Sequence, residues 1–208
     1  MIIFDLDGTL WDTVEATYKA VNIIISKYDD IKPITLDTVK NGMGLSSAEN
    51  SKNYMPYLDE SKALDYLKEI SKTTSKIIND VGANIYDGVE NTIINLAKNY
   101  KLGIITNNND EYVKAFFKVS KLDNYFIDYI GTASYGITKS DAIKEMVNRN
   151  HAVNSFYVGD IEKDMIAALN AKVGFIHAKY GFGKNLKSKY SIENINELPD
   201  LMNSINRV

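Results

Sequence analysis

Two aspartates follow the first apolar run of the chain at a spacing that suits chemistry. Asp5 and Asp7 come directly after Ile2–Phe4, and Gly8 ends the run. A short β-branched and aromatic run of this kind predicts a buried strand. Side chains two residues apart leave a strand on the same side, and open α/β sheets bind ligands at the carboxyl ends of strands. The two carboxylates are therefore expected to face one crevice, although Asp and Gly are also common in plain turns.

Polar side chains also follow three later apolar runs, at 102–105, 126–130 and 156–158. In chain order they are Thr106 and Asn107, then Lys139 at the start of a helix, then Asp160 and Asp164. The carboxyl ends of the predicted strands thus carry carboxylates, a hydroxyl, an amide and an ammonium group. The asparagines after Thr106 also fit a plainer role, because Asn and Asp begin helices well, and Asp110 fits that role better.

Four carboxylates in one crevice repel one another, and without compensation one or more would take up a proton. A divalent cation resolves this repulsion, and an all-oxygen ligand set selects a hard ion such as Mg²⁺. The chain has no cysteine and only two histidines, which excludes disulfides, thiolate nucleophiles and cysteine- or histidine-based metal sites. Taken alone, Asp160 and Asp164 would also fit an acid pair at a helix N-terminus, where the helix dipole favours negative charge.

The composition allows one good core, or one core with a small extra domain. The chain has 208 residues, of which 45 % are hydrophobic. Its net charge is −3, with 24 basic and 27 acidic residues spread along the chain, so no basic surface for nucleic acid is expected. No apolar segment has membrane length, and no signal-like segment precedes Asp5. We therefore expect a cytoplasmic protein that does not bind membranes and that starts at Met1.

Two kinds of pattern divide the chain. Between about 14 and 82, apolar residues recur at helical spacing, first from Val14 onward and later from Leu64 onward, and no strand is evident. From Ile85, helical patterns alternate with strands and end in a short strand near Tyr190 and a terminal helix. Such alternation predicts an α/β fold with a doubly wound parallel sheet. The helical segment is predicted to be an insertion between the first and second strands.

The ordered set of motifs, namely DxDGT, a strand-final Thr, a Lys and GDxxxD, resembles that of the haloacid dehalogenase superfamily of phosphotransferases. The resemblance covers nearly the whole chain in the same order. The helical insertion is similar in position to the cap domain of the phosphoglycolate-phosphatase-like branch. The resemblance implies a Rossmann-like core domain of residues 1–13 and 83–208, with an inserted helical cap domain of residues 14–82.

The same resemblance implies a role for each carboxylate. Asp5 is the implied nucleophile, because carboxylates can attack phosphoryl groups, and Asp7 is the implied general acid and base. Asp5 and Asp160 would bind Mg²⁺ through their side chains, Asp7 would add its backbone carbonyl, and Asp164 would hold a metal-bound water. Aspartate at both leading positions disfavours the dehalogenase branch, which lacks the second acid, and the phosphonoacetaldehyde branch, which has a small residue there.

The remaining motif residues are implied to bind phosphate. The Thr106 hydroxyl and the backbone N–H of Asn107 would hold the transferring phosphoryl oxygens, and Lys139 would neutralise charge on the nucleophile and the phosphate. Many family members of this shape have Pro after the lysine, whereas this chain has Ser140, and Lys144 is a nearby alternative.

The implied function is Mg²⁺-dependent hydrolysis of a small phosphomonoester, of phosphoglycolate or sugar-phosphate type, through an aspartyl-phosphate. The implied partner is a small phosphorylated metabolite. One alternative is a sugar phosphomutase similar to β-phosphoglucomutase, but Gly42–Ser47 offers no arginine for phosphate. Another is a non-catalytic phosphate-sensing module, which the presence of both Asp5 and Asp7 counts against. The segment Gly42–Gly44 is expected either to enter the site, because glycine allows close backbone approach, or to be a plain interhelical turn.

Overall fold

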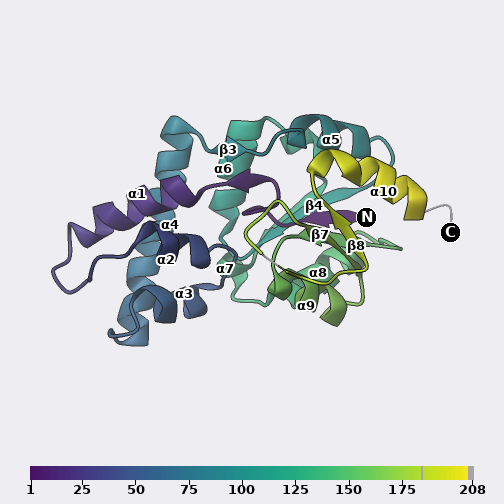
Figure 1. Ribbon diagram of the computed structural model, residues 1–208. Coiled ribbons are helices and arrows are strands. Elements are labelled where there is room, and N and C mark those ends of the chain that lie inside the picture. Colours follow the sequence, from purple (N-terminus) through teal and green to yellow (C-terminus); the bar gives the residue numbers. More distant parts are fainter. Residues whose placement is uncertain (184, 206–208) are drawn as a thin grey trace.

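Six strands form one parallel sheet in the computed structural model, which describes residues 1–183 and 185–205 (Figure 1). The sheet order is β5-β4-β1-β6-β7-β8, and every neighbouring pair is parallel. The strands are β1 (Ile2–Phe4), β4 (Leu102–Thr106), β5 (Asp128–Gly131), β6 (Phe156–Gly159), β7 (Gly174–Ala178) and β8 (Tyr190–Ile192). The predicted doubly wound α/β sheet is confirmed.

Different helices cover the two faces of the sheet. Successive side chains of a strand point to opposite faces, so neighbouring residues of β1 contact different helices. Ile2 and Phe4 pack in one apolar cluster with α5, α6 and α10, whereas Ile3 packs in another with α8 and α9. The helices of this part of the chain are α5 (Val89–Leu96), α6 (Asp110–Ser120), α7 (Thr132–Tyr135), α8 (Lys139–Arg149), α9 (Glu162–Asn170), α10 (Leu198–Ile205), and the short 3₁₀ helices η1 (Asp123–Tyr125) and η2 (Ile195–Glu197).

Strand β1 lies in the middle of the sheet, between β4 and β6. The chain adds β4 and β5 on one side of β1, and then β6, β7 and β8 on the other side. In open α/β sheets, the ligand crevice lies at such a reversal, outside the carboxyl ends of the strands. Asp5 and Asp7 leave β1 at this point.

Residues 14–81 contain four helices that share an apolar cluster of their own, with contributions such as Val21 and Leu67. The helices are α1 (Val14–Ile25), α2 (Leu36–Asn41), α3 (Ser47–Tyr54) and α4 (Glu60–Val81). Thr35, Ser46 and Asp59 accept backbone N–H groups at the N-termini of α2, α3 and α4. Such side-chain caps explain why these three helices begin where they do. In Figure 1 the four helices lie to one side of the sheet.

A two-stranded antiparallel ribbon joins the ends of this helical segment. Its strands are β2 (Trp11–Asp12) and β3 (Asn84–Ile85), and Trp11 pairs with Ile85. Neither strand was predicted, because two residues are too few to show a period. Trp11 is fully buried and packs edge-on against the rings of Tyr112 and Phe116 in α6. These contacts hold the start of the helical segment against the core.

The start of one strand and one short helix differ from what the sequence predicts. Strand β5 begins at Asp128 and not at Phe126, because η1 precedes it and the Phe126 ring packs among other aromatic rings of the core. Helix α7 was not predicted, since four residues make only one turn. The short strand near Tyr190 and the terminal helix are confirmed. Among the described residues, no helix combines the length and the apolar character needed to cross a membrane.

Candidate active site

The side chains predicted at the strand ends come together at the carboxyl edge of the sheet. Each of six side chains exposes 7 % or less of its surface: Asp5, Asp7, Thr106, Lys139, Asp160 and Asp164. Asp5 and Asp7 follow β1, and Thr106 is the last residue of β4. Asp160 follows β6, Lys139 is the first residue of α8, and Asp164 lies in α9. Asn107 directly follows β4 and is half-buried.

The Lys139 ammonium bridges two carboxylates. Its Nζ donates to Asp5 Oδ1 at 3.0 Å and to Asp164 Oδ1 at 2.7 Å. Burial alone would lower the pKa of Lys139, but the negative charges of Asp164 and Asp5 outweigh it and raise that pKa well above its usual value. Lys144, further along α8, is exposed and pairs with Asp141 on the surface. Of the two lysines considered, Lys139 is the one that reaches the site.

Two buried carboxylate oxygens lack a hydrogen-bond partner among the described residues. They are Asp5 Oδ2 and Asp160 Oδ1, while Asp160 Oδ2 accepts the backbone N–H of Phe182 at 2.6 Å. Burial raises the pKa of Asp5 to about 7, although the charge of Lys139 opposes the rise. Burial, followed by the charges of Asp164 and Asp5, raises the pKa of Asp160 well above its ordinary range. A divalent cation between the two free oxygens would satisfy both and would offset the crowded negative charge.

Asp164 supports this arrangement without a free oxygen of its own. Its Oδ1 accepts from Lys139, and its Oδ2 accepts the backbone N–H groups of Asp160 at 3.1 Å and Ile161 at 3.2 Å. One carboxylate oxygen from each of Asp5, Asp160 and Asp164 lies within 4.8 Å of the others. The residues therefore fit a cation bound directly by Asp5 and Asp160, with Asp164 outside the ligand shell.

Two glycines let the backbone close around Asp160. Gly8 has a φ of +81°, and a Cβ there would lie 2.2 Å from Asp160 Oδ2. A Cβ on Gly181 would lie 2.3 Å from the Asp160 Cβ. A side chain at either position would displace Asp160, so both glycines are needed for this carboxylate to stand beside Asp5.

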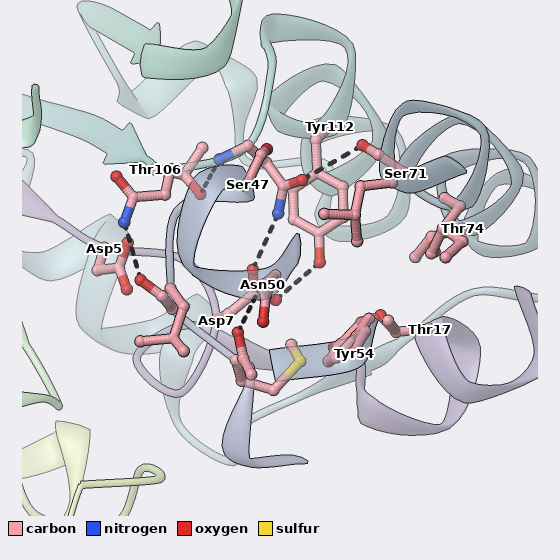
Figure 2. A pocket seen from close by; sticks show the side chains of 18 residues that line it. Asp5, Asp7, Thr17, Ser47, Asn50, Tyr54, Ser71, Thr74, Thr106 and Tyr112 are labelled. Carbon is pink, nitrogen blue, oxygen red and sulfur yellow. Dashed lines mark hydrogen bonds between the residues drawn. The ribbon is translucent and has the colours of Figure 1, made fainter. Parts of the chain in front are cut away.

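Asp7 is held by two hydroxyl groups that the sequence analysis did not identify. Thr13 Oγ1 donates to Asp7 Oδ1 at 2.7 Å. The Tyr112 hydroxyl also donates to Oδ1 at 2.7 Å, and Asn108 Nδ2 contacts Oδ2 at 3.4 Å (Figure 2). Burial raises the pKa of Asp7, although the two hydroxyls oppose the rise. Oδ1 is thus fixed, and in the described part of the chain Oδ2 has only the long contact with Asn108. Tyr112 lies one turn before Phe116 on the buried face of α6. A buried tyrosine hydroxyl needs a hydrogen-bond partner, so this helical spacing could have marked Tyr112 as a residue that contacts a polar group.

Two of the three asparagines after β4 connect the sheet edge to the helical segment. Asn107 Nδ2 donates to the backbone carbonyl of Gly44 at 2.8 Å. The Asn108 side-chain oxygen accepts the Ser71 hydroxyl of α4 at 3.3 Å. The side chains of Asn107 and Asn108 therefore do more than cap the next helix, which was the plainer alternative.

The end of β4 and the start of α6 differ in one detail from expectation. The Thr106 hydroxyl accepts the backbone N–H of Asn108 at 3.2 Å, so its own proton is free to be donated elsewhere. Asn109 caps α6 through its side-chain oxygen. The expectation that Asp110 caps this helix was wrong: Asp110 is the first helical residue, and its carboxylate accepts the backbone N–H of Gly131 at 2.7 Å.

A cavity of about 90 Å³ lies between the aspartates and the helical segment (Figure 2). Asp5, Asp7 and Thr106 line it from the sheet edge, and α1, α3 and α4 line it from the helical segment. All three residues of Gly42–Gly44 also line it, so this segment does enter the site. The cavity therefore lies directly beside the two leading carboxylates.

Comparison with known proteins agrees with this geometry. Residues 2–178 match the family model described as haloacid dehalogenase-like hydrolase. The phosphoglycolate phosphatase of Psychrobacter arcticus is 25 % identical over 88 % of this chain and 84 % of its own length. The pyrophosphatase PpaX of Listeria monocytogenes is 28 % identical over 82 % of this chain and 79 % of its own length.

Solved structures share the fold over nearly the whole chain. A haloacid dehalogenase-like family protein from Streptococcus pneumoniae aligns with a TM-score of 0.84 at 18 % identity, over 97 % of both chains. A predicted phosphatase from Clostridium acetobutylicum aligns with a TM-score of 0.80 at 25 % identity, over 98 % of this chain and 97 % of its own. This chain belongs to the haloacid dehalogenase-like hydrolase family.

Proposed function

We propose that this protein is a Mg²⁺-dependent phosphatase that hydrolyses a small phosphomonoester through an aspartyl-phosphate. The observation that carries the proposal is the pair of buried carboxylates after β1. Asp5 stands beside Lys139 with one oxygen that has no partner among residues 1–183 and 185–205, and Asp7 is oriented by two hydroxyls. Relatives named phosphoglycolate phosphatase and pyrophosphatase support a hydrolysis of this type. A small phosphorylated metabolite as partner and a cytoplasmic location belong to the same proposal.

In the first step, a carboxylate oxygen of Asp5 bonds to phosphorus, and the bond from phosphorus to the leaving oxygen breaks. Asp7 gives a proton from Oδ2 to the leaving oxygen. Burial favours this role because it raises the pKa of Asp7, so the group holds a proton more readily than an exposed aspartate does. The hydroxyls of Thr13 and Tyr112 keep Oδ1 in place while Oδ2 transfers the proton.

In the second step, water attacks the phosphorus of the aspartyl-phosphate, and the bond from phosphorus to the Asp5 oxygen breaks. Asp7 is now a carboxylate and takes a proton from the attacking water. Phosphate leaves, and both aspartates return to their starting states. The proton that Asp7 gave to the leaving group is thus replaced by one from water.

Charge on the transferring phosphoryl group is offset by three groups of this chain. The Lys139 ammonium, the Thr106 hydroxyl and the backbone N–H of Asn107 are proposed to fill this role. The Lys139 ammonium is already held beside Asp5, and the Thr106 proton is free to be donated. Little movement of these side chains is then needed when the substrate binds, which favours the transition state.

The proposed metal ligands are the free oxygens of Asp5 and Asp160 and the backbone carbonyl of Asp7. Bound there, Mg²⁺ would neutralise charge on the substrate phosphate, which is how this ion acts in phosphoryl transfer. Asp164 positions the other groups by accepting hydrogen bonds from Lys139 and from the backbone at Asp160.

We further propose that residues 14–82 act as a cap domain on a core of residues 1–13 and 83–208. The hydrogen bonds from Asn107 to Gly44 and from Ser71 to Asn108 join the two parts across the cavity. A cap closed in this way excludes bulk water while the aspartyl-phosphate forms. The cap also supplies most of the residues that line the cavity, where the leaving group would lie.

The proposal is tested by hydrolysis of p-nitrophenyl phosphate, followed by the release of nitrophenolate with Mg²⁺ or with EDTA. Turnover is expected only with Mg²⁺ and is expected to vanish in Asp5→Asn, because an amide does not attack phosphorus at a useful rate. Asp29→Asn makes the same chemical change at an exposed position and serves as the control. Full turnover by metal-free protein in EDTA would refute the metal assignment, and near-wild-type turnover by Asp5→Asn would refute the nucleophile.

A further inference from the structure

The cavity of the proposed phosphatase site is polar, but apart from its two aspartates it is uncharged. Among the residues that the structure describes, no Lys, Arg, His or Glu lines it. Apolar contact comes from side chains such as Met43 and Leu67. Six neutral polar side chains line it from α1, α3 and α4: Thr17, Ser47, Asn50, Tyr54, Ser71 and Thr74 (Figure 2). A lining of hydroxyls and an amide suits a leaving group that exchanges hydrogen bonds and not one that carries charge.

Asn50 adds a buried acceptor without a partner. Its Nδ2 donates to the carbonyl of Gly42 at 2.9 Å, and this bond fixes the amide because a carbonyl oxygen only accepts. Its Oδ1 is buried and has no partner in the described part of the chain. Asn50 lines the cavity with a neutral amide, which can exchange hydrogen bonds with a substrate hydroxyl but offers a substrate carboxylate no positive charge.

The charge balance of the site points the same way. The site already holds four carboxylates, and the one buried ammonium among the described residues, on Lys139, is shared between two of them. Burying a further anion without a paired cation is unfavourable. Lys40 and Lys163 line a neighbouring groove, not this cavity, and Lys163 is paired with Glu49.

We propose that the leaving group of the substrate is a small uncharged skeleton that carries hydroxyl groups, as in a polyol or a sugar. The site selects against a leaving group that carries a carboxylate or a second phosphate. This inference rests on the proposed phosphatase function. It sets the expected preference of this chain apart from phosphoglycolate and pyrophosphate, the compounds in the names of its relatives.

The test compares matched substrates by phosphate release in the presence of Mg²⁺. Glycerol 3-phosphate and 3-phosphoglycerate have the same number of carbons. The first has a hydroxymethyl group where the second has a carboxylate. The ratio of their kcat/KM values is expected to favour glycerol 3-phosphate by at least about 10-fold, and pyrophosphate is expected to be poorer still. The aryl phosphate is assayed in parallel, because its hydrolysis reports the phosphatase activity without these contacts.

Two variants sharpen the comparison. Thr17→Lys introduces a cation into the cavity from α1 and is expected to shift the ratio toward 3-phosphoglycerate by about 10-fold or more. Lys40→Ala removes a cation from the neighbouring groove and is expected to leave the ratio within about 2-fold of wild type.

The outcomes separate the two claims. No hydrolysis of any compound, the aryl phosphate included, would refute the phosphatase function and this inference with it. Hydrolysis of the aryl phosphate with an equal or higher kcat/KM for 3-phosphoglycerate, or with no turnover of any polyol or sugar phosphate, would refute the inference alone. A ratio that rises well beyond about 2-fold in Lys40→Ala would also refute it, because the groove cation would then be contacting the carboxylate of 3-phosphoglycerate.

Discussion

Replacing Asp5 with asparagine is expected to stabilise the metal-free protein while it abolishes turnover. Asp5 is fully buried, and burial raises its pKa from 3.8 to about 7 even though Lys139 stands 3.0 Å away. The folded state therefore binds more protons than the unfolded state between these two pKa values. Stability must then fall as the pH rises through this window, and the full cost of the ionised carboxylate is present above about pH 7.

The size of the effect follows from the shift in the pKa. One pKa unit corresponds to about 1.4 kcal/mol, so a rise from 3.8 to about 7 means that ionised Asp5 costs the folded state about 4 kcal/mol. At pH 5 the cost is only about 2 kcal/mol, because the folded-state carboxyl is still protonated there. Asparagine resembles the protonated acid in shape and carries no charge. Asp5→Asn should therefore gain most of this free energy, and the gain should grow with pH.

The assay is urea unfolding of wild type and Asp5→Asn in EDTA at pH 5 and pH 8. The free energy of unfolding of the variant is expected to exceed that of wild type by about 4 kcal/mol at pH 8 and by about half as much at pH 5. Mg²⁺ should narrow the gap at pH 8 by stabilising the wild type. Asp29→Asn, at an exposed position, should change stability by less than about 0.5 kcal/mol at either pH. A variant that is no more stable than wild type at pH 8, or a gain that does not depend on pH, would show that ionised Asp5 does not destabilise the folded protein.

Three further predictions concern the groups around the two aspartates. Tyr112→Phe removes one hydroxyl from Asp7 and should lower kcat for an alkyl phosphate by roughly 10-fold, the value of one such hydrogen bond. The aryl phosphate, whose leaving group needs no proton, should lose less, and equal losses on both would deny Tyr112 a role in proton transfer. Lys139→Met leaves two buried carboxylates unpaired and should cost about 3–5 kcal/mol in urea unfolding at pH 8. Lys144→Met, on the exposed side of the same helix, should cost less than about 0.5 kcal/mol, and similar costs for the two would contradict the assignment of the buried lysine. Gly8→Ala forces a Cβ against the Asp160 carboxylate and should raise the Mg²⁺ concentration for half-maximal activity by at least about 10-fold, whereas an unchanged value would show that the loop adjusts freely.

The sheet and the strand-end side chains could be predicted because they depend on local patterns. Buried runs such as Ile2–Phe4 mark strands by composition alone, and alternation with helices fixes the parallel arrangement. Parallel strands present their carboxyl ends at one edge, so Asp5, Thr106 and Asp160 had to meet there. Lys139 was predicted to be the lysine of the site, and Lys144 was kept as an alternative. The sequence does not show which of two neighbouring lysines faces inward.

The contacts that the sequence did not reveal are those made between distant elements. Tyr112 reaches Asp7 across 105 positions of sequence, and no periodic pattern reports such a contact. Asn107 and Asn108 look like helix-capping residues in the sequence, yet their side chains contact the helical segment. The cavity lining is a product of how α1, α3 and α4 pack over the sheet edge, so its neutral character became visible only in the fold.

We propose that the phosphoryl group is transferred to Asp5 and is then released with the help of Asp7. Trapping the protein with the phosphoryl group on Asp5 is the most direct test of this proposal. Asp7→Asn is mixed with a ³²P-labelled aryl phosphate and Mg²⁺, quenched within milliseconds, and digested to locate the label. The first step should proceed because the aryl leaving group needs no proton, and the second step should stall because no base activates water. We expect label to accumulate on Asp5 in Asp7→Asn and to be absent from the Asp5→Asn, Asp7→Asn double variant. Unlabelled protein during measurable aryl phosphate hydrolysis by Asp7→Asn, or label that persists in the double variant, would contradict it.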